Sequence, residues 1–152
     1  SKKKPCTCSA SEIKRYLSKI SGPLLDRIDM QIEMDAVSVE EIENAREQED
    51  SATDRARGLK ARKLQQERYH GLNIFCNAQL HQEGLEQFCA MTKEAKQLLL
   101  SAVDRFSISM RTYGRIQKVA RTFADLAGHE QIEISDVAKA IQFRNLEGRF
   151  WN

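Results

Sequence analysis

The sequence has no phosphate-binding loop. Its seven glycines are followed in order by Pro, Leu, Leu, Leu, Arg, His and Arg, so the chain contains no Gly-Lys pair. A G-x-x-x-x-G-K-[ST] loop is therefore excluded. The sequence also lacks an apolar strand ending in Asp-Glu, the element that holds magnesium beside a bound nucleotide. These absences argue against a nucleotide hydrolase that is complete within this chain.

Long apolar runs and a strong net charge are also missing. No run approaches the roughly 20 residues that span a bilayer, and the opening Ser-Lys-Lys-Lys-Pro-Cys lacks the apolar segment of a signal peptide. We therefore expect a cytoplasmic protein with no membrane partner. The 24 basic residues nearly balance the 22 acidic ones, for a net charge of +2. Any contact with nucleic acid must then be local.

The four cysteines are too few and too scattered for a disulfide framework. Cys76 and Cys89 stand among apolar residues, which predicts buried thiols. Cys6 and Cys8 form a Cys-x-Cys pair that could offer two thiolates to a metal. Zinc requires four ligands, and no second pair follows at a usable spacing. The pair is equally compatible with an incidental tail.

One segment has the pattern of a strand. Residues 30–35 alternate apolar and polar side chains. A single strand cannot satisfy its own backbone hydrogen bonds. We therefore expect its sheet either in a longer protein, with sequence upstream of this chain, or in a second copy.

The remainder of the sequence is predicted to be helical. Capping boxes at Ser9/Glu12 and Ser38/Glu41 begin two helices, the first ending near Ile20. Later helices have N-cap residue types at Thr92, Ser109 and Ser135, and Gly128 is suited to end the helix that Ser109 begins. The highly charged segment 50–69 is interpreted as a solvated helix or a linker, with a nucleic-acid surface as the alternative. The other helices are predicted at 82–90, 92–106, 109–127 and 135–144, and the residues predicted to face inward are Leu98, Leu99, Ala102, Val103, Phe106, Ile116, Val119, Ala120, Phe123 and Leu126.

Two basic features could act on phosphate groups. A short apolar turn at residues 21–29 presents Arg27, whose guanidinium could stabilise a transferring phosphoryl group. A salt bridge from Arg27 to a neighbouring aspartate is the alternative. Arg111, Arg115 and Lys118 form a basic stripe from a helix N-terminus, a position that favours anions. An ordinary solvated face is the alternative for that stripe.

Together these segments resemble the C-terminal part of the ComM/YifB family, AAA+ ATPases related to the magnesium-chelatase ATPase subunit. The resemblance lies in I-x-R-Y-x-x-x-I-S-G-P-L-L-D-R-I-D within 13–33, in N-A-Q-L at 77–80, and in 109–126. It implies a mainly α fold: an AAA+ helical lid bundle preceded by the trailing edge of the α/β ATPase core, with one strand and short helices. The implied divisions are a core edge over 1–37, a helical connector over 38–63 and the lid over 64–152.

The same resemblance implies roles for particular residues. Arg27 matches the arginine finger that reaches the ATP of a neighbouring subunit. Arg111 matches the sensor-2 arginine, which contacts the γ-phosphate region in its own subunit, and Arg115 assists it. Cys6 and Cys8 match half of a four-thiolate zinc site.

For the whole protein, the resemblance implies ATP and Mg²⁺, a homo-oligomeric ring expected to be a hexamer, and remodelling or branch migration of DNA. Two alternative functions remain. One is tetrapyrrole metallation by a magnesium-chelatase ATPase subunit. The other is a helix-turn-helix DNA-binding module made by 92–106 and 109–127, although a pI of 8.4 is not strongly basic.

Overall fold

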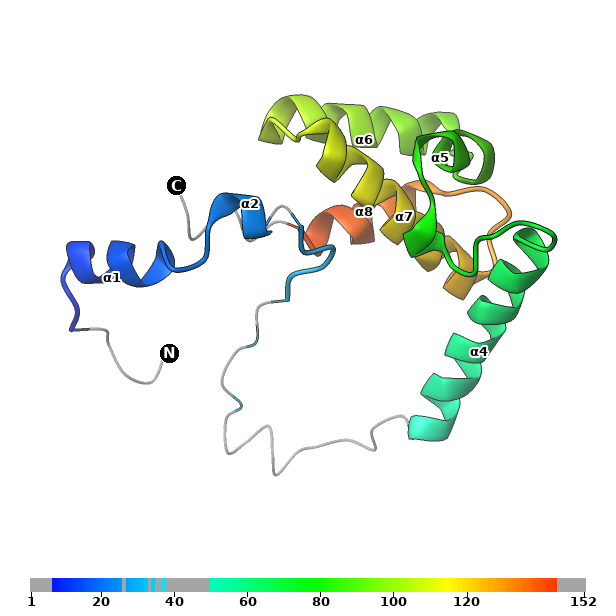
Figure 1. Ribbon diagram of the computed structural model, residues 1–152, viewed down its shortest axis with the longest axis horizontal. Helices are drawn as coiled ribbons and strands as arrows, with labels where there is room; N and C mark the ends of the chain where they lie inside the picture. Colours follow the sequence, from blue (N-terminus) through cyan, green and yellow to red (C-terminus); the bar gives the residue numbers. More distant parts are fainter. Residues whose placement is uncertain (1–6, 26, 33, 35–36, 38–49, 145–152) are drawn as a thin grey trace.

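The computed structural model describes residues 7–25, 27–32, 34, 37 and 50–144 (Figure 1). This part of the chain is mainly helical. No helix within it is long and apolar enough to cross a membrane. The elements are α1 Ala10–Leu17, α2 Gly22–Leu25, α4 Ser51–Arg68, η1 Asn77–Gln79, α5 Gln82–Phe88, α6 Lys93–Phe106, α7 Met110–Ala127 and α8 Ile134–Gln142.

Most predicted helix boundaries are confirmed, because the capping side chains make the expected hydrogen bonds. The Ser9 hydroxyl accepts from the Glu12 amide, and the Glu12 carboxylate accepts from the Ser9 amide. The Thr92 and Ser109 hydroxyls cap α6 and α7 by accepting from the amides of Ala95 and Thr112. Gly128 ends α7 with a left-handed backbone, φ 81°.

Other boundary predictions are wrong or lie outside the described residues, and α1, for example, ends at Leu17 rather than near Ile20. Helix α8 begins at Ile134 rather than Ser135, because Glu133 and Asp136 form its capping box. An acidic pair therefore performs the capping role predicted for Ser135. The predicted capping box at Ser38/Glu41 lies outside the described residues.

Helix α7 is the central element of the bundle. It contacts α4, α5, η1 and α8, while α6 packs on α8. Figure 1 shows α1 and α2 on one side of this bundle and the N-terminal end of α4 projecting from the other. The buried apolar core consists of Tyr69, Leu80, Leu85, Cys89, Ala95, Leu99, Ile116, Ala120, Ala124, Ile132, Val137 and Ala140.

The predicted core is correct in its centre and wrong at its ends. Leu99, Ala102, Ile116 and Ala120 are buried, and Leu98, Val119 and Phe123 pack against the core. Phe106 is 48% exposed and Leu126 46% exposed. Phe106 is the last residue of α6, and the left-handed C-cap Ser107, with φ 50°, ends the helix there. Leu126 is not part of the core, because the buried face of α7 at this end is formed by Ala124 and Asp125.

The predicted strand at 30–35 is not found at its described residues, 30–32 and 34. The Gln31 amide donates to the Phe143 carbonyl, with an N···O distance of 2.6 Å, so this segment is attached to the end of α8. A strand requires a neighbouring strand to pair with. In the described ranges the β-type pairing is an isolated bridge between Met91 and Ile132.

Candidate functional site

Arg27 lies in the turn that follows α2. Pro23 and Leu24 supply carbonyls to this turn, and the Arg27 amide donates to the Leu24 carbonyl at 3.0 Å. The exposed guanidinium of Arg27 folds back and donates to the Pro23 carbonyl at 3.0 Å. Leu25 is 5% exposed and anchors the turn. The predicted finger is therefore presented at the surface, and among the described residues its guanidinium donates to one neutral acceptor, which a phosphate could replace.

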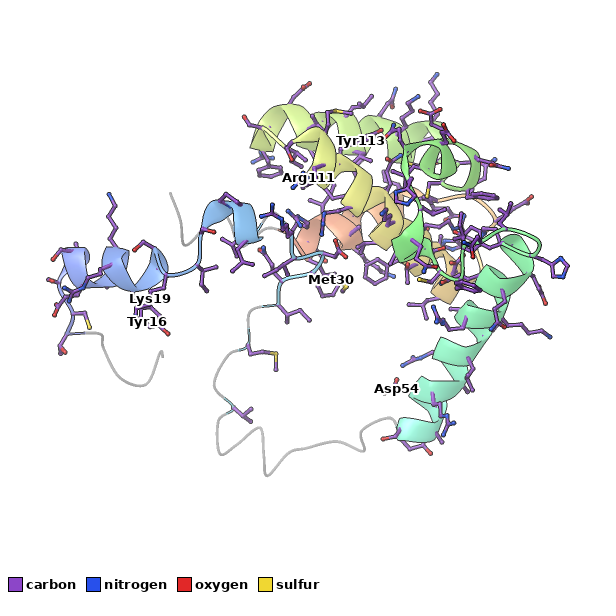
Figure 2. All side chains as sticks on the ribbon, viewed as in Figure 1. Tyr16, Lys19, Met30, Asp54, Arg111 and Tyr113 are labelled. Carbon is purple, nitrogen blue, oxygen red and sulfur yellow. The ribbon has the colours of Figure 1, made fainter. Side chains whose placement is uncertain are left out.

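Arg111 lies in the first turn of α7. Ser109 caps this helix by accepting from the Thr112 amide at 3.2 Å. Arg111 is exposed, whereas the adjacent Thr112 is buried. Figure 2 shows Arg111 and Tyr113 on this N-terminal part of α7. The cation therefore stands next to helix-terminal amides that favour an anion.

Arg115 connects these two features. It follows Arg111 by one helical turn, and its guanidinium donates both to the backbone carbonyl of Arg27 and to the carboxylate of Asp29. The structure therefore brings the turn that carries Arg27 against the same stretch of helix that carries Arg111. The partner of Asp29 is Arg115 rather than Arg27, and Asp26, the other aspartate beside Arg27, lies outside the described residues.

The predicted basic stripe is only partly a free surface. Arg115 is directed at the Arg27 turn, and Lys118 donates to the Ala78 carbonyl at 3.0 Å. Both side chains use their charge within the chain. Arg111 is the exposed arginine of the stripe.

Arg144 makes a second connection, which no sequence pattern predicted. It is 7% exposed, and its guanidinium donates to the carbonyl of Ile28 and, at 3.3 Å, to the hydroxyl of Thr112. The Gln31 amide donates to the Phe143 carbonyl beside it. No local pattern marks Arg144, because its partners lie far away in sequence.

A buried polar network fixes the C-terminal half of α7. Asp125 is 1% exposed and accepts from Arg68, from Asn77 at 2.9 Å and from Arg121 at 3.1 Å. Burial alone would raise the pKa of Asp125, but the hydrogen bonds from Arg68 and Asn77 and the charge of Arg121 hold that pKa below its ordinary value.

Asn77, in the N-A-Q-L segment, is a structural residue of this network. Its side-chain carbonyl accepts from the Tyr69 hydroxyl at 2.7 Å, and its amide group donates to Thr122 at 3.0 Å. Arg121 extends the network by donating to the carbonyls of His129 and Glu130, at 2.7 and 2.8 Å. Helix α7 is thus attached to α4, to η1 and to the loop before α8.

The cysteines divide by burial. Cys89 is 3% exposed, and burial raises the pKa of its thiol to about 11. Cys76 is half-buried, so its predicted burial is only partial, and Cys8 is exposed. Cys6 lies outside the described residues. Within the described ranges no three His, Cys, Asp or Glu side chains gather to hold a metal ion, and the zinc role of the Cys6/Cys8 pair stays a prediction.

Comparison with known proteins agrees with this architecture. Residues 48–144 match the family described as magnesium chelatase, subunit ChlI C-terminal, and residues 1–42 match magnesium chelatase, subunit ChlI. The helical bundle is thus of the class formed by the C-terminal helical lid domain. The chain belongs to the magnesium-chelatase-related family, as a member of the ComM/YifB type.

The relatives are bacterial proteins much longer than this chain. Competence protein ComM of Haemophilus influenzae is 36% identical over 137 residues, which cover 90% of this chain and 26% of the relative. YifB of Escherichia coli is 30% identical over 141 residues, 92% of this chain and 27% of the relative. An uncharacterized protein of Mycobacterium tuberculosis is 33% identical over 144 residues, which cover 95% of this chain and 28% of the relative. The chain therefore spans about a quarter of these relatives.

Proposed function

We propose that this chain supplies two arginines to the ATP sites of an AAA+ ATPase of the ComM/YifB type. Arg27 serves as the arginine finger and Arg111 as the sensor-2 arginine of the helical lid. The observation that carries the proposal is the contact of Arg115 with the turn that holds Arg27. Two cations separated by 84 positions in the sequence are thereby presented from one connected surface.

The proposed role of Arg27 follows from its exposure and its chemistry. A guanidinium stays charged at all physiological pH values and can bind two phosphate oxygens at once. Leaving the Pro23 carbonyl, 3.0 Å away, exchanges a hydrogen bond to a neutral acceptor for stronger ones to anionic phosphate oxygens. The side chain would then stabilise the charge that develops on the γ-phosphoryl group of the ATP bound by a neighbouring subunit.

ATP and Mg²⁺ would be held mainly by other parts of the protein. The sequence of this chain contains neither a G-K-[ST] loop nor the acidic strand that binds magnesium. Its own contribution would be cationic groups, which add charge stabilisation at a nucleotide cradled elsewhere.

We further propose that the complete protein forms a homo-oligomeric ring, expected to be a hexamer, and couples ATP hydrolysis to remodelling or branch migration of DNA. A finger that acts in trans requires a neighbouring subunit. DNA as the substrate is supported by the resemblance to the ComM/YifB family and by a relative that is named a competence protein.

The finger role is tested by Arg27→Ala in the complete ATPase. ATP binding should persist, and turnover should fall by about 10³- to 10⁵-fold. Arg62→Ala, an exposed arginine of α4, is the matched control and should keep normal turnover. Full turnover by Arg27→Ala would remove the basis of the proposal.

Mixed rings test the trans arrangement. Subunits with a disabled phosphate loop but an intact Arg27 should restore hydrolysis to Arg27→Ala neighbours. No restoration in rings shown to contain both subunits would assign Arg27 to its own subunit's nucleotide.

A substrate assay separates the two activities that the family suggests. Stimulation of ATP turnover by branched DNA, together with movement of the branch point, would support the DNA role. ATP-dependent insertion of magnesium into a porphyrin, with no response to DNA, would support the alternative that the family description carries.

A further inference from the structure

The turn that carries Arg27 is connected to the lid bundle mainly by polar contacts. Leu25 is its buried apolar side chain, 5% exposed. The apolar side chains around and after this turn are exposed: Leu24 by 48%, Ile28 by 39%, Met30 by 43% and Ile32 by 61%. Met30 marks the path of this segment in Figure 2. Apolar packing within the described chain therefore does little to fix where Arg27 stands.

Arg115 makes the most direct of the polar contacts. Its guanidinium donates to the backbone carbonyl of Arg27 itself and also to the carboxylate of Asp29. The Arg115 side chain is 25% exposed and that of Asp29 53% exposed, so the pair lies at the rim of the bundle. A charged donor that holds both ends of a three-residue segment restricts its direction as well as its distance.

Arg144 holds the residue between those two contacts. It donates to the Ile28 carbonyl and to the hydroxyl of Thr112, the neighbour of Arg111. The backbone of the finger turn is therefore attached to two places on the lid, the first half of α7 and the end of α8. Both places belong to the body of helices whose core includes Ile116 and Val137.

We propose that Arg115 is a positioning residue for Arg27. It transmits the position of α7 to the finger, so that a shift of the helix that carries Arg111 also moves the backbone of Arg27. The inference rests on the proposed function of Arg27. It assigns Arg115 to a contact within the chain instead of the direct contact with nucleotide that the family resemblance implies. Helix α7 then couples a nucleotide contact at Arg111 to the finger.

Asp29 distinguishes these two roles of Arg115. A carboxylate repels phosphate, so a nucleotide-binding role of Arg115 predicts no loss of turnover when the charge of Asp29 is removed. The positioning role predicts that Asp29→Asn and Arg115→Ala both lower kcat. A displacement of about 1 Å can cost about 10²-fold in rate, and we expect losses between about 10- and 10²-fold with KM for ATP changed less than about threefold.

The experiment is a double-mutant cycle on the complete ATPase. The double variant Asp29→Asn/Arg115→Ala should be no slower than Arg115→Ala, because the shared contact is lost only once. The exchanged pair Asp29→Arg/Arg115→Asp should recover part of the kcat that Asp29→Arg loses, since opposite charges face each other again. Arg62→Ala is the control for a lost surface arginine, and melting temperatures show that each variant is folded.

The outcomes separate this inference from the proposed function. If Arg27→Ala abolishes turnover while Asp29→Asn keeps the wild-type kcat, the finger role stands and the positioning role of Arg115 is wrong. A raised KM for ATP in Arg115→Ala with an unchanged kcat would also overturn it, in favour of direct nucleotide binding. Full turnover by Arg27→Ala would instead contradict the proposed function itself.

Discussion

The guanidinium of Arg68, in the last turn of α4, binds the carboxylate of Asp125, in the last turn of α7, across 57 positions of sequence. The side chain of Asp125 is 0% exposed and that of Arg68 is 20% exposed. The hydrogen bond with Asp125 raises the pKa of Arg68. This ion pair attaches the long polar helix α4 to the centre of the bundle.

Loss of the Asp125 charge should therefore destabilise the chain strongly. Asp125→Asn leaves Arg68 and the buried Arg121 without a counter-charge, and breaking a buried pair in this way costs about 3–5 kcal/mol. Asp104→Asn, on the exposed side of α6, should change the free energy of unfolding by less than about 0.5 kcal/mol. Urea unfolding followed by circular dichroism measures both. Equal effects of the two changes would show that the network contributes little.

The same carboxylate should make stability dependent on acid pH. The folded-state pKa of Asp125 is lowered, so its contribution is present above the unfolded-state pKa of about 4 and is lost as pH falls through the folded-state value. The wild-type urea midpoint should fall progressively below about pH 4. The midpoint of Asp125→Asn should fall less over that interval. Parallel pH curves for the two proteins would exclude Asp125 as the titrating group.

The sequence predicted the helices well because their signals are local. Ser9, Thr92 and Ser109 each cap the helix that the capping pattern indicated. The predicted strand had no such support, because its hydrogen bonds depend on a neighbour that the local pattern does not contain. Leu126 illustrates a third case: its apolar character predicted burial, but the buried face of α7 ends in a polar network.

The contacts around the predicted site were not predictable from the sequence. Motifs singled out Arg27 and Arg111 as candidates, and their roles stay predictions, whereas the contact of Arg115 with Asp29 joins positions 86 apart. Arg144 had no local signal because it acts on the backbone carbonyl of Ile28. Backbone acceptors have no sequence signature, so contacts of this kind emerge only from the tertiary structure.

The thiols should differ sharply in reactivity. At pH 7 a thiol with a pKa of about 11 is ionised to about 1 part in 10⁴, and the thiolate is the reactive form. In a Cys6→Ser background, iodoacetamide should therefore modify Cys8 first, half-buried Cys76 more slowly and Cys89 only after unfolding. Mass spectrometry of the alkylated peptides measures the order. Modification of Cys89 as fast as Cys8 in the folded chain would contradict its burial.

Gly128 and Gly58 should respond in opposite directions to alanine. A Cβ at either position meets no atom within 4 Å, but Gly128 has φ +81°, where an L side chain costs about 1–2 kcal/mol. Gly128→Ala should lower the free energy of unfolding by that amount. Gly58 lies inside α4, and Gly58→Ala should increase helix stability by about 0.5–1 kcal/mol. Urea unfolding followed by circular dichroism measures the change in the free energy of unfolding for each variant. Changes of the same sign in the two variants would contradict the prediction that backbone conformation decides the effect.

The last prediction concerns which subunit's ATP Arg111 acts on. The family resemblance assigns it to the nucleotide of its own subunit, so Arg111→Ala should slow hydrolysis only when the changed subunit also binds the ATP. Mixed rings with a phosphate-loop-disabled partner measure this, because the change can be placed in either subunit type. Arg115, one turn further along α7, contacts the backbone of Arg27. Because this contact joins the Arg27 turn to α7, the alternative is that Arg27 and Arg111 both act on a neighbour's nucleotide. If hydrolysis is slowed only when Arg111→Ala is in the subunit with the disabled phosphate loop, the own-subunit assignment is wrong. Arg27 and Arg111 would then both act on the ATP of a neighbouring subunit.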